Sequence, residues 1–215
     1  MMKLCKIIRI ITVAPLAAAV ALTLLLLRGN FFVSNMHYIA ALTALTVFPL
    51  LAYPISLVKK ADERRKFQRT LAIVLSVAGY IGGMVFALLT SAPVGERVLY
   101  LTYLLSGVAI AFSSFVLKKK SSGHACGIAG PVALLAYYIH PLYLLGLMLL
   151  LPVGYASLKM KRHTLPQLVS GAVIPIVCLL ASTAIRYIPL FPVGYIIIIV
   201  HVYNIPAFFL RVAYC

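Results

Sequence analysis

Long apolar runs separated by short polar segments dominate the chain. They lie at roughly 8–27, 37–58, 70–90, 97–117, 125–157, 168–185 and 188–210. The run 125–157 is interrupted at His140-Pro141, so we divide it into two short spans. These lengths suit membrane-crossing α-helices, and lipid cannot satisfy free backbone groups. The pattern therefore predicts an all-α, polytopic membrane helical bundle of about eight (six to eight) transmembrane helices.

Composition supports a single integral membrane domain over residues 1–215. The chain is 64% hydrophobic and 10% charged, with a mean hydropathy of +1.09, whereas soluble domains are about half apolar and about a quarter charged. The N-terminal run is long for a signal peptide and is interpreted as the first span. The four cysteines are scattered, which predicts neither a disulfide framework nor a metal cluster.

The charge is strongly one-sided. Lys and Arg number 19 against three acids, for a net charge of +16. With eight spans, every Lys and Arg except Arg28, Arg97 and Arg186 lies on one side of the membrane. This asymmetry predicts a multi-pass protein of the cell membrane with its basic face in the cytoplasm. If these cations bind substrate instead, they would lie on one face whichever way the protein is oriented in the membrane. Lipid phosphate is a simpler partner than nucleic acid, so no nucleic-acid partner is expected.

Three polar segments, 59–69, 118–124 and 157–167, lie on this basic side. They contain two of the five histidines, His124 and His163. Three acids are too few for a hydrolase with paired carboxylates or for a carboxylate metal site, so no metal or other cofactor is expected. Cations, hydroxyls and backbone N–H groups at a helix start favour a phosphate site. Gly123 allows close approach, and imidazole can act as nucleophile and acid near neutral pH.

At these residues the chain resembles the type-2 phosphatidic acid phosphatase superfamily of integral membrane lipid phosphatases, over about residues 55–180. The family's second motif is Pro-Ser-Gly-His, and this chain reads Ser121-Ser122-Gly123-His124. Its third motif is Ser-Arg, five residues, His, three residues, Asp. Here Ala156-Ser157 is followed by LKMKR, His163, three residues and Gln167. The resemblance implies that His163 is the nucleophile, that His124 is the acid and later the base, and that Ser122 and the Gly123 backbone hold phosphate oxygens.

The chain departs from the family pattern at positions that bear on function. Ser157 stands where the family has a phosphate-binding arginine, and Arg162, Lys159 or Lys161 would have to replace it. Gln167 replaces the orienting Asp; it can accept a hydrogen bond from the His163 ring but carries no charge. The first motif, Lys, six residues, Arg-Pro, matches poorly. The resemblance implies a phosphate clamp only for a group of cations, namely Lys60, Arg64, Arg65 and Lys66.

Two functions from different classes follow. The first is a metal-independent lipid phosphatase that cleaves a polyprenyl diphosphate or phosphatidate-like lipid through a phosphohistidine intermediate, and Gln167 favours the polyprenyl diphosphate. The second is a catalytically impaired relative that binds or translocates anionic lipid, which Ser157 favours. The expected partners are a membrane lipid substrate and the bilayer, and the oligomeric state is left open.

Structural interpretations stand beside these functional ones. His124 and His163 could be boundary histidines bonded to lipid headgroups, and Ser122-Gly123 could be a simple helix cap. His37, His140 and His201 are interpreted as structural. Gly79-xxx-Gly83 predicts a helix-packing face. A transporter finds little support, because no ionisable residue other than histidines near span ends is expected to be buried mid-span.

Overall fold

The apolar runs fold as helices. The structure, a computed structural model, describes residues 8, 12–29, 31–118 and 120–185, and these residues form no strand. The described helices are α2 (Ala14–Gly29), α3 (Asn35–Leu42), the π-helical turn η1 (Thr43–Val47), α4 (Phe48–Ile55), the 3₁₀ turn η2 (Ser56–Val58), α5 (Ala61–Leu89), α6 (Val94–Phe115), α7 (Gly123–Tyr138), the 3₁₀ segment η3 (Pro141–Leu149), α8 (Leu150–Lys159) and α9 (Leu165–Ile185).

Five helical segments are long and apolar enough to cross a membrane, which indicates a multi-pass membrane protein. They are Asn35–Val58, Asp62–Leu89, Val94–Phe115, Pro141–Lys159 and Leu165–Ile185. The first and fifth predicted spans correspond to the shorter helices α2 and α7, of 16 residues each. The predicted span 188–210, with His201, lies outside the described residues. The all-α prediction is thus confirmed for the part of the chain that the structure describes.

The predicted break at His140-Pro141 is confirmed. His140 has an extended backbone between α7 and η3, and its Nδ1 accepts a hydrogen bond from the Leu142 N–H. Proline without an N–H suits the first position of a new helix. One predicted boundary is wrong. We expected 59–69 to be a connection, but α5 already begins at Ala61. Asp62 and Glu63 occupy its first turn, where acidic side chains interact favourably with the helix dipole.

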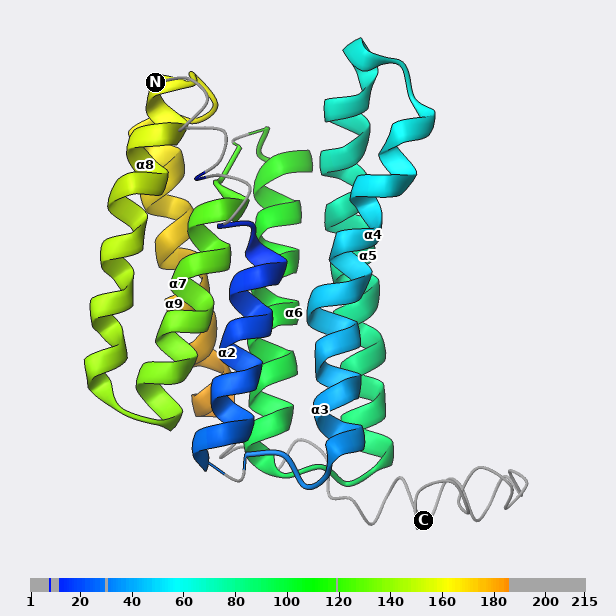
Figure 1. Ribbon diagram of the computed structural model, residues 1–215, viewed down its shortest axis with the longest axis vertical. Helices are drawn as coiled ribbons and strands as arrows, with labels where there is room; N and C mark the ends of the chain where they lie inside the picture. Colours follow the sequence, from blue (N-terminus) through cyan, green and yellow to red (C-terminus); the bar gives the residue numbers. More distant parts are fainter. Residues whose placement is uncertain (1–7, 9–11, 30, 119, 186–215) are drawn as a thin grey trace.

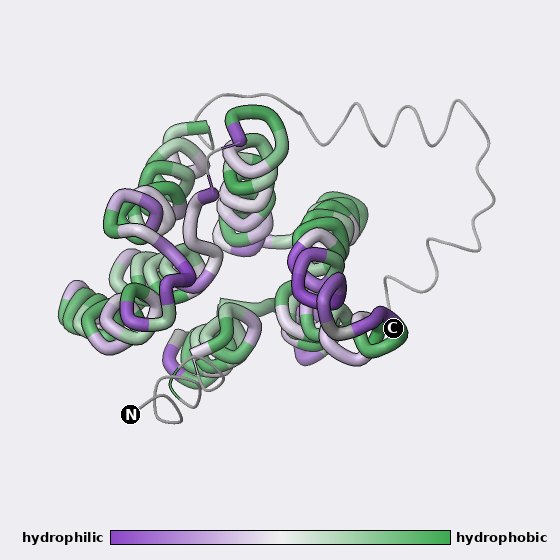
Figure 2. The backbone as a smooth tube through the Cα atoms, turned by 90° about the horizontal axis from the view of Figure 1, so that it is seen from above, coloured by the Kyte–Doolittle hydropathy of each residue, from purple (hydrophilic) through white to green (hydrophobic). Residues whose placement is uncertain are grey.

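The three predicted polar segments gather at one end of the bundle. Figure 1 shows the connections η2–α5 (cyan), α6–α7 (green) and α8–α9 (yellow) together at the top, and the connections α2–α3, α5–α6 and α7–η3 at the other end. We call the first end, with residues 59–69, 118–124 and 157–167, the basic end. Figure 2 looks down on it and shows hydrophilic stretches in the connections and mostly hydrophobic helix bodies.

The core lies where α2, η1, α6 and α7 meet. Its largest fully buried side chains include Leu22, Leu45, Leu99, Tyr100 and Leu134. Large apolar side chains also cover the outside of the bundle; examples are Val74 and Ile81 on α5 and Val173 and Leu180 on α9. Exposed apolar surface on this scale is typical of a lipid-facing protein.

The glycine pair on α5 confirms the predicted packing face. A Cβ at Gly79 would overlap the Ala44 carbonyl oxygen of η1, and a Cβ at Gly83 would overlap the Tyr100 ring of α6. The absence of a side chain at both positions therefore lets α5 approach its neighbours closely. These contacts position α5, and with it the first polar segment, next to α6.

Candidate functional site

A backbone hydrogen bond joins the second and third predicted motifs. The Ser122 N–H, just before α7, donates to the Gln167 carbonyl oxygen in the first turn of α9, at 2.9 Å. Ser122 and Gln167 are 45 positions apart in the chain, and the helices α7 and α9 pack along each other. The structure thus brings the Ser-Gly-His segment and the His163 segment to the same place at the basic end.

The close approach of α9 depends on Gly171. A Cβ at this position would overlap the carbonyl oxygen of Ser122 and press on the Ser122 nitrogen at 3.0 Å. Backbone atoms cannot move aside as a flexible side chain can. Any other residue at position 171 therefore has to push α9 away from the start of α7, and the hydrogen bond between Ser122 and Gln167 would be strained.

A group of hydroxyls extends the junction to α6. Ser121 Oγ lies 3.0 Å from Ser113 Oγ in the last turns of α6, and Ser170 Oγ of α9 donates to Ser121 Oγ at 3.2 Å. The Gln167 carbonyl oxygen, 3.2 Å from Ser170 Oγ, is a second acceptor for the same hydroxyl hydrogen. Three elements, α6, the 118–122 connection and α9, are therefore tied together by polar contacts at the basic end.

Ser122 is the N-cap of α7. Its side chain is fully buried, and its Oγ accepts a hydrogen bond from the Ala125 N–H at 3.3 Å. This is the cap that the sequence allowed as an alternative, and the phosphate-binding role of Ser122 remains a prediction. Gly123, by contrast, is exposed, and a Cβ there would meet no atom within 4 Å. The N-terminus of α7 is therefore open, which is the usual geometry for anion binding.

Gln167 orients His163. The Nδ1 atom of His163 lies 3.1 Å from Gln167 Oε1, which also accepts from the Thr164 N–H at 3.3 Å. Because an amide oxygen only accepts, Nδ1 is the donor in this contact, and in the neutral ring Nε2 then carries the lone pair. The expected contact between these two side chains is confirmed. His163 and, in the first turn of α7, His124 are both partly buried; their roles in catalysis remain predictions.

The Ser157 side chain is not accessible from the surface. It is fully buried in α8, and its carbonyl oxygen accepts from the Arg162 N–H at 2.9 Å, which closes the end of that helix. Lys161, in between, has a positive φ of 49°, a conformation that costs about 1–2 kcal/mol for most residues. Arg162 lies next to His163 and is half-buried, and its predicted phosphate contact is untested.

The clamp residues lie on a different helix from the two histidine motifs. Lys60 is the N-cap of α5, and Arg64, Arg65 and Lys66 lie in its first turns. Helix α5 packs on α4 and α6, whereas α9 packs on α6 and α7, so α6 is the one shared neighbour. Figure 1 shows α6 between α5 and the pair α7 and α9. Lys66 also lines a groove of about 510 Å³ with Lys59, Asp62 and Glu63, so cations and carboxylates are equal in number there. The clamp role of these four residues remains a prediction.

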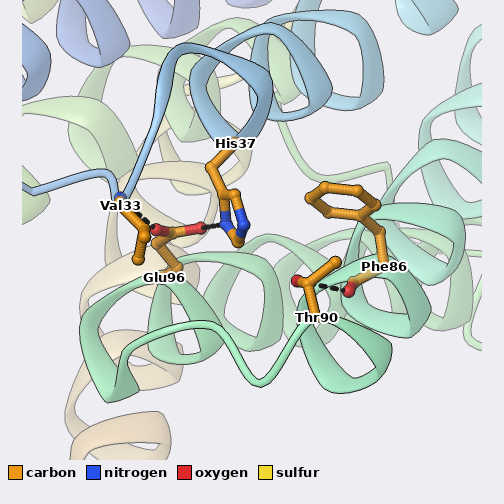
Figure 3. A network of polar contacts seen from close by, with 5 residues as sticks. All are labelled: Val33, His37, Phe86, Thr90 and Glu96. Carbon is orange, nitrogen blue, oxygen red and sulfur yellow. Dashed lines mark hydrogen bonds and ion pairs between the residues drawn. The ribbon is translucent and has the colours of Figure 1, made fainter. Parts of the chain in front are cut away.

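A second polar group, at the opposite end of the bundle, was missed at the sequence level. Glu96 in the first turn of α6 is fully buried. Its Oε2 lies 2.7 Å from His37 Nδ1 in α3, and its Oε1 accepts from the Val33 N–H at 3.2 Å (Figure 3). The His37 ring packs edge-on against Phe86. Glu96 lies at the end of its span, so it falls outside the expectation that no ionisable residue other than histidine is buried mid-span.

The described residues contain no group of three or more His, Cys, Asp or Glu side chains that could hold a metal ion. No protein-family model, no curated protein and no solved structure matches the chain. The resemblance to the lipid phosphatases therefore remains a hypothesis, which is supported by the geometry of the basic end.

Proposed function

We propose that this protein is a metal-independent membrane lipid phosphatase that acts on a polyprenyl diphosphate or a phosphatidate-like lipid. The observation that supports it best is the hydrogen bond between Ser122 and Gln167. It makes one structural unit of the two segments that carry His124 and His163. The open N-terminus of α7 and the surrounding cations would attract a phosphate to this unit.

In the proposed reaction, His163 attacks the phosphorus. Its Nε2 forms a bond to phosphorus while the bond to the leaving lipid oxygen breaks, and protonated His124 gives its proton to that oxygen. Water then attacks the phosphorus, His124 takes a proton from this water, and the bond between phosphorus and nitrogen breaks. Inorganic phosphate leaves and both histidines return to their starting states.

The contact between His163 and Gln167 supports this assignment of roles. The Gln167 oxygen fixes the hydrogen on Nδ1, so that Nε2 keeps the lone pair that a nucleophile needs. An uncharged amide stabilises the imidazolium-like transition state less than a carboxylate does, so we expect a modest rate. Lys and Arg side chains at the same end would stabilise the negative charge of the phosphoryl oxygens.

The proposal includes the membrane arrangement. We infer about eight spans (six to eight), and a basic end that faces the cytoplasm because Lys and Arg concentrate there. A substrate in the inner leaflet would present its phosphate at the level of the α6–α7 and α8–α9 connections. The gathering of these connections at one end of the bundle supports this arrangement.

A second candidate is a non-catalytic protein that binds or translocates anionic lipid. Its support is that Ser157, an uncharged and fully buried residue, stands where the resembled family has a phosphate-binding arginine. Both candidates require an anionic lipid at the basic end, and they differ only in whether phosphate is released.

Phosphate release in the presence of EDTA separates the two. We expect the purified full-length protein to release phosphate from a polyprenyl diphosphate or from phosphatidate, and His163→Ala and His124→Ala to lower kcat by about 10³-fold or more. His140→Ala is the matched control, since His140 lies at the opposite end and is exposed. Binding of both lipids without any release would establish the non-catalytic candidate instead.

A further inference from the structure

The groove at the start of α5 combines charges of both signs. Its lining residues are Lys59, just before the helix, and Asp62, Glu63, Lys66, Phe67 and Thr70. They recur at intervals of three and four positions, so they share one face of the helix. The arginines of α5 do not line the groove, namely Arg64, Arg65 and Arg69. Two cations and two carboxylates are therefore balanced here, at an otherwise basic end of the bundle.

The four charged side chains of the groove are not used up by one another. The described residues contain one ion pair, and it lies at the opposite end of the bundle. Lys59 Nζ lies over the Phe67 ring, 5.6 Å from its centre. Asp62 and Glu63 are exposed, and they are two of only three acids in the chain. Both carboxylates are therefore accessible to a ligand that carries a cation.

The groove lies at the depth of the lipid headgroups. The apolar run of this span begins at residue 70, and residues 61–69 extend the helix beyond it by about 13 Å. The headgroup layer on each side of a bilayer is about 5–8 Å thick. Lys66 lies about one helical turn nearer to the bilayer than Asp62 and Glu63. From the bilayer outward, a headgroup therefore meets first a cation of α5 and then the carboxylates.

An apolar stripe continues the groove toward the interior of the bilayer. Val74 and Ile81 follow Phe67 at intervals of seven residues, close to two full turns, so the three share one face of α5. The side chains of Val74 and Ile81 are 55% and 48% exposed. A ligand here meets charges at one end and accessible apolar side chains at the other, which fits a lipid better than a water-soluble molecule.

We propose that this groove binds a bilayer phospholipid of the ethanolamine type, whose headgroup carries a phosphate and a primary ammonium. The phosphate is attached to the glycerol, and the ammonium follows two carbon atoms further out. Lys59 and Lys66 bind the phosphate, and the two carboxylates accept hydrogen bonds from the ammonium. A quaternary ammonium such as choline has no N–H to donate, and a glycerol headgroup has no cation.

This lipid is not the substrate of the proposed reaction. Figure 1 shows α6 between α5 and the pair α7 and α9, which carry the histidine segments. The inference therefore stands or falls independently of the proposed phosphatase. The alternative is a solvated helix face on which Lys66 pairs transiently with Asp62, four residues earlier. Such a face has no preference among headgroups, and lipid retention separates the two.

The test uses vesicles with equal amounts of phosphatidylethanolamine, phosphatidylglycerol and phosphatidylcholine with identical acyl chains. Full-length protein is extracted in mild detergent, and the retained lipid is quantified by mass spectrometry. We expect wild type to retain phosphatidylethanolamine over each of the others by about ten-fold. Asp62→Asn combined with Glu63→Gln should abolish this preference, and Lys66→Gln should lower retention of phosphatidylethanolamine. Lys120→Gln is the matched control, because Lys120 is exposed in another segment of the same end, and it should leave the preference unchanged.

A charge exchange tests the order of the charges. Asp62→Lys combined with Lys66→Asp keeps the net charge but reverses the order with depth, and it should abolish the preference as the double neutralisation does. Equal retention of the three lipids by wild type, or a preference that survives the exchange, would overturn the proposal. So would a wild-type preference for phosphatidylglycerol, because attraction to cations alone would explain it. Melting temperatures identify any variant that fails to fold; the neutralisation and the exchange test the same claim, so either one decides it.

Discussion

His37 Nδ1 and Glu96 Oε2 lie 2.7 Å apart and join the first turn of α3 to the first turn of α6. The two side chains are 59 positions apart in the chain, and both are buried. Glu96 also binds the Val33 N–H, so one carboxylate ties together the connection before α3 and two helices. The pair is therefore a cross-link at the end of the bundle opposite the candidate site.

The first prediction concerns the stability contributed by this pair. His37→Ala leaves the buried Glu96 Oε2 without its hydrogen-bond partner, and we expect a loss of about 2–3 kcal/mol. Glu96→Gln retains an oxygen that can accept from Val33, so a smaller loss of about 1–2 kcal/mol is expected. Thermal unfolding in detergent, followed by circular dichroism, measures both. A His37→Ala protein as stable as wild type would show that water or lipid replaces the histidine.

The second prediction concerns Gly171. Gly171→Ala forces α9 away from the Ser122 carbonyl, and we expect a loss of about 1–3 kcal/mol, typical of overpacking. Gly82→Ala is the matched control, because a Cβ at Gly82 in α5 meets no atom within 4 Å and alanine favours helix by up to about 1 kcal/mol. The two melting temperatures should therefore shift in opposite directions. Equal shifts would mean that α9 does not approach Ser122 this closely.

The third prediction uses the open space at Gly123. Gly123→Ala adds a methyl group that meets no protein atom within 4 Å, so the melting temperature should change little. On the proposed function, the same methyl group lies where a phosphate approaches the α7 N-terminus, and we expect KM to rise about ten-fold, a cost of about 1.4 kcal/mol in binding. Steady-state kinetics with a lipid phosphate measures this. Unchanged kinetics would place the phosphate elsewhere.

The fourth prediction tests Gln167, the partner of His163, which is the nucleophile in the proposed function. Gln167→Ala removes the oxygen that orients His163, and we expect kcat to fall about 10- to 100-fold, as is common when the group that holds a functional histidine is removed. Gln167→Asp restores a charged partner and should equal or exceed the wild-type rate. Single-turnover phosphate release separates this effect from substrate binding. A Gln167→Ala enzyme with full activity would remove His163 from the nucleophile's role.

Hydrophobic pattern was sufficient to locate the helices because each run supplies about one bilayer thickness of apolar residues. It failed at the start of α5, where charged residues with good helix propensity, led by Asp62 and Glu63, continue the helix beyond the apolar run. Periodicity also correctly identified Gly79 and Gly83 as a packing face. Helix positions and small-residue packing faces depend on residues that are close in the chain, so the local sequence is enough to predict them.

The tertiary contacts at the two ends could not be read in the same way. The pairing of His37 with Glu96 and the contact of Gly171 with Ser122 depend on how distant helices pack. The contact of His163 with Gln167 was predictable because a spacing of four residues brings side chains together around a helix start. The isolated Glu96, far from the other two acids, was the one available signal for the buried pair.

The accessible N-terminus of α7 has a consequence for the fate of a phosphorylated histidine. With Gly123 exposed and a Cβ there meeting no atom within 4 Å, small nucleophiles could reach the phosphoryl group without a prior helix movement. Methanol or glycerol added to the assay would then compete with water as acceptor, and the yield of alkyl phosphate would grow in proportion to the alcohol concentration. On the proposed mechanism, the choice between hydrolysis and transfer is thus set by the composition of the solvent.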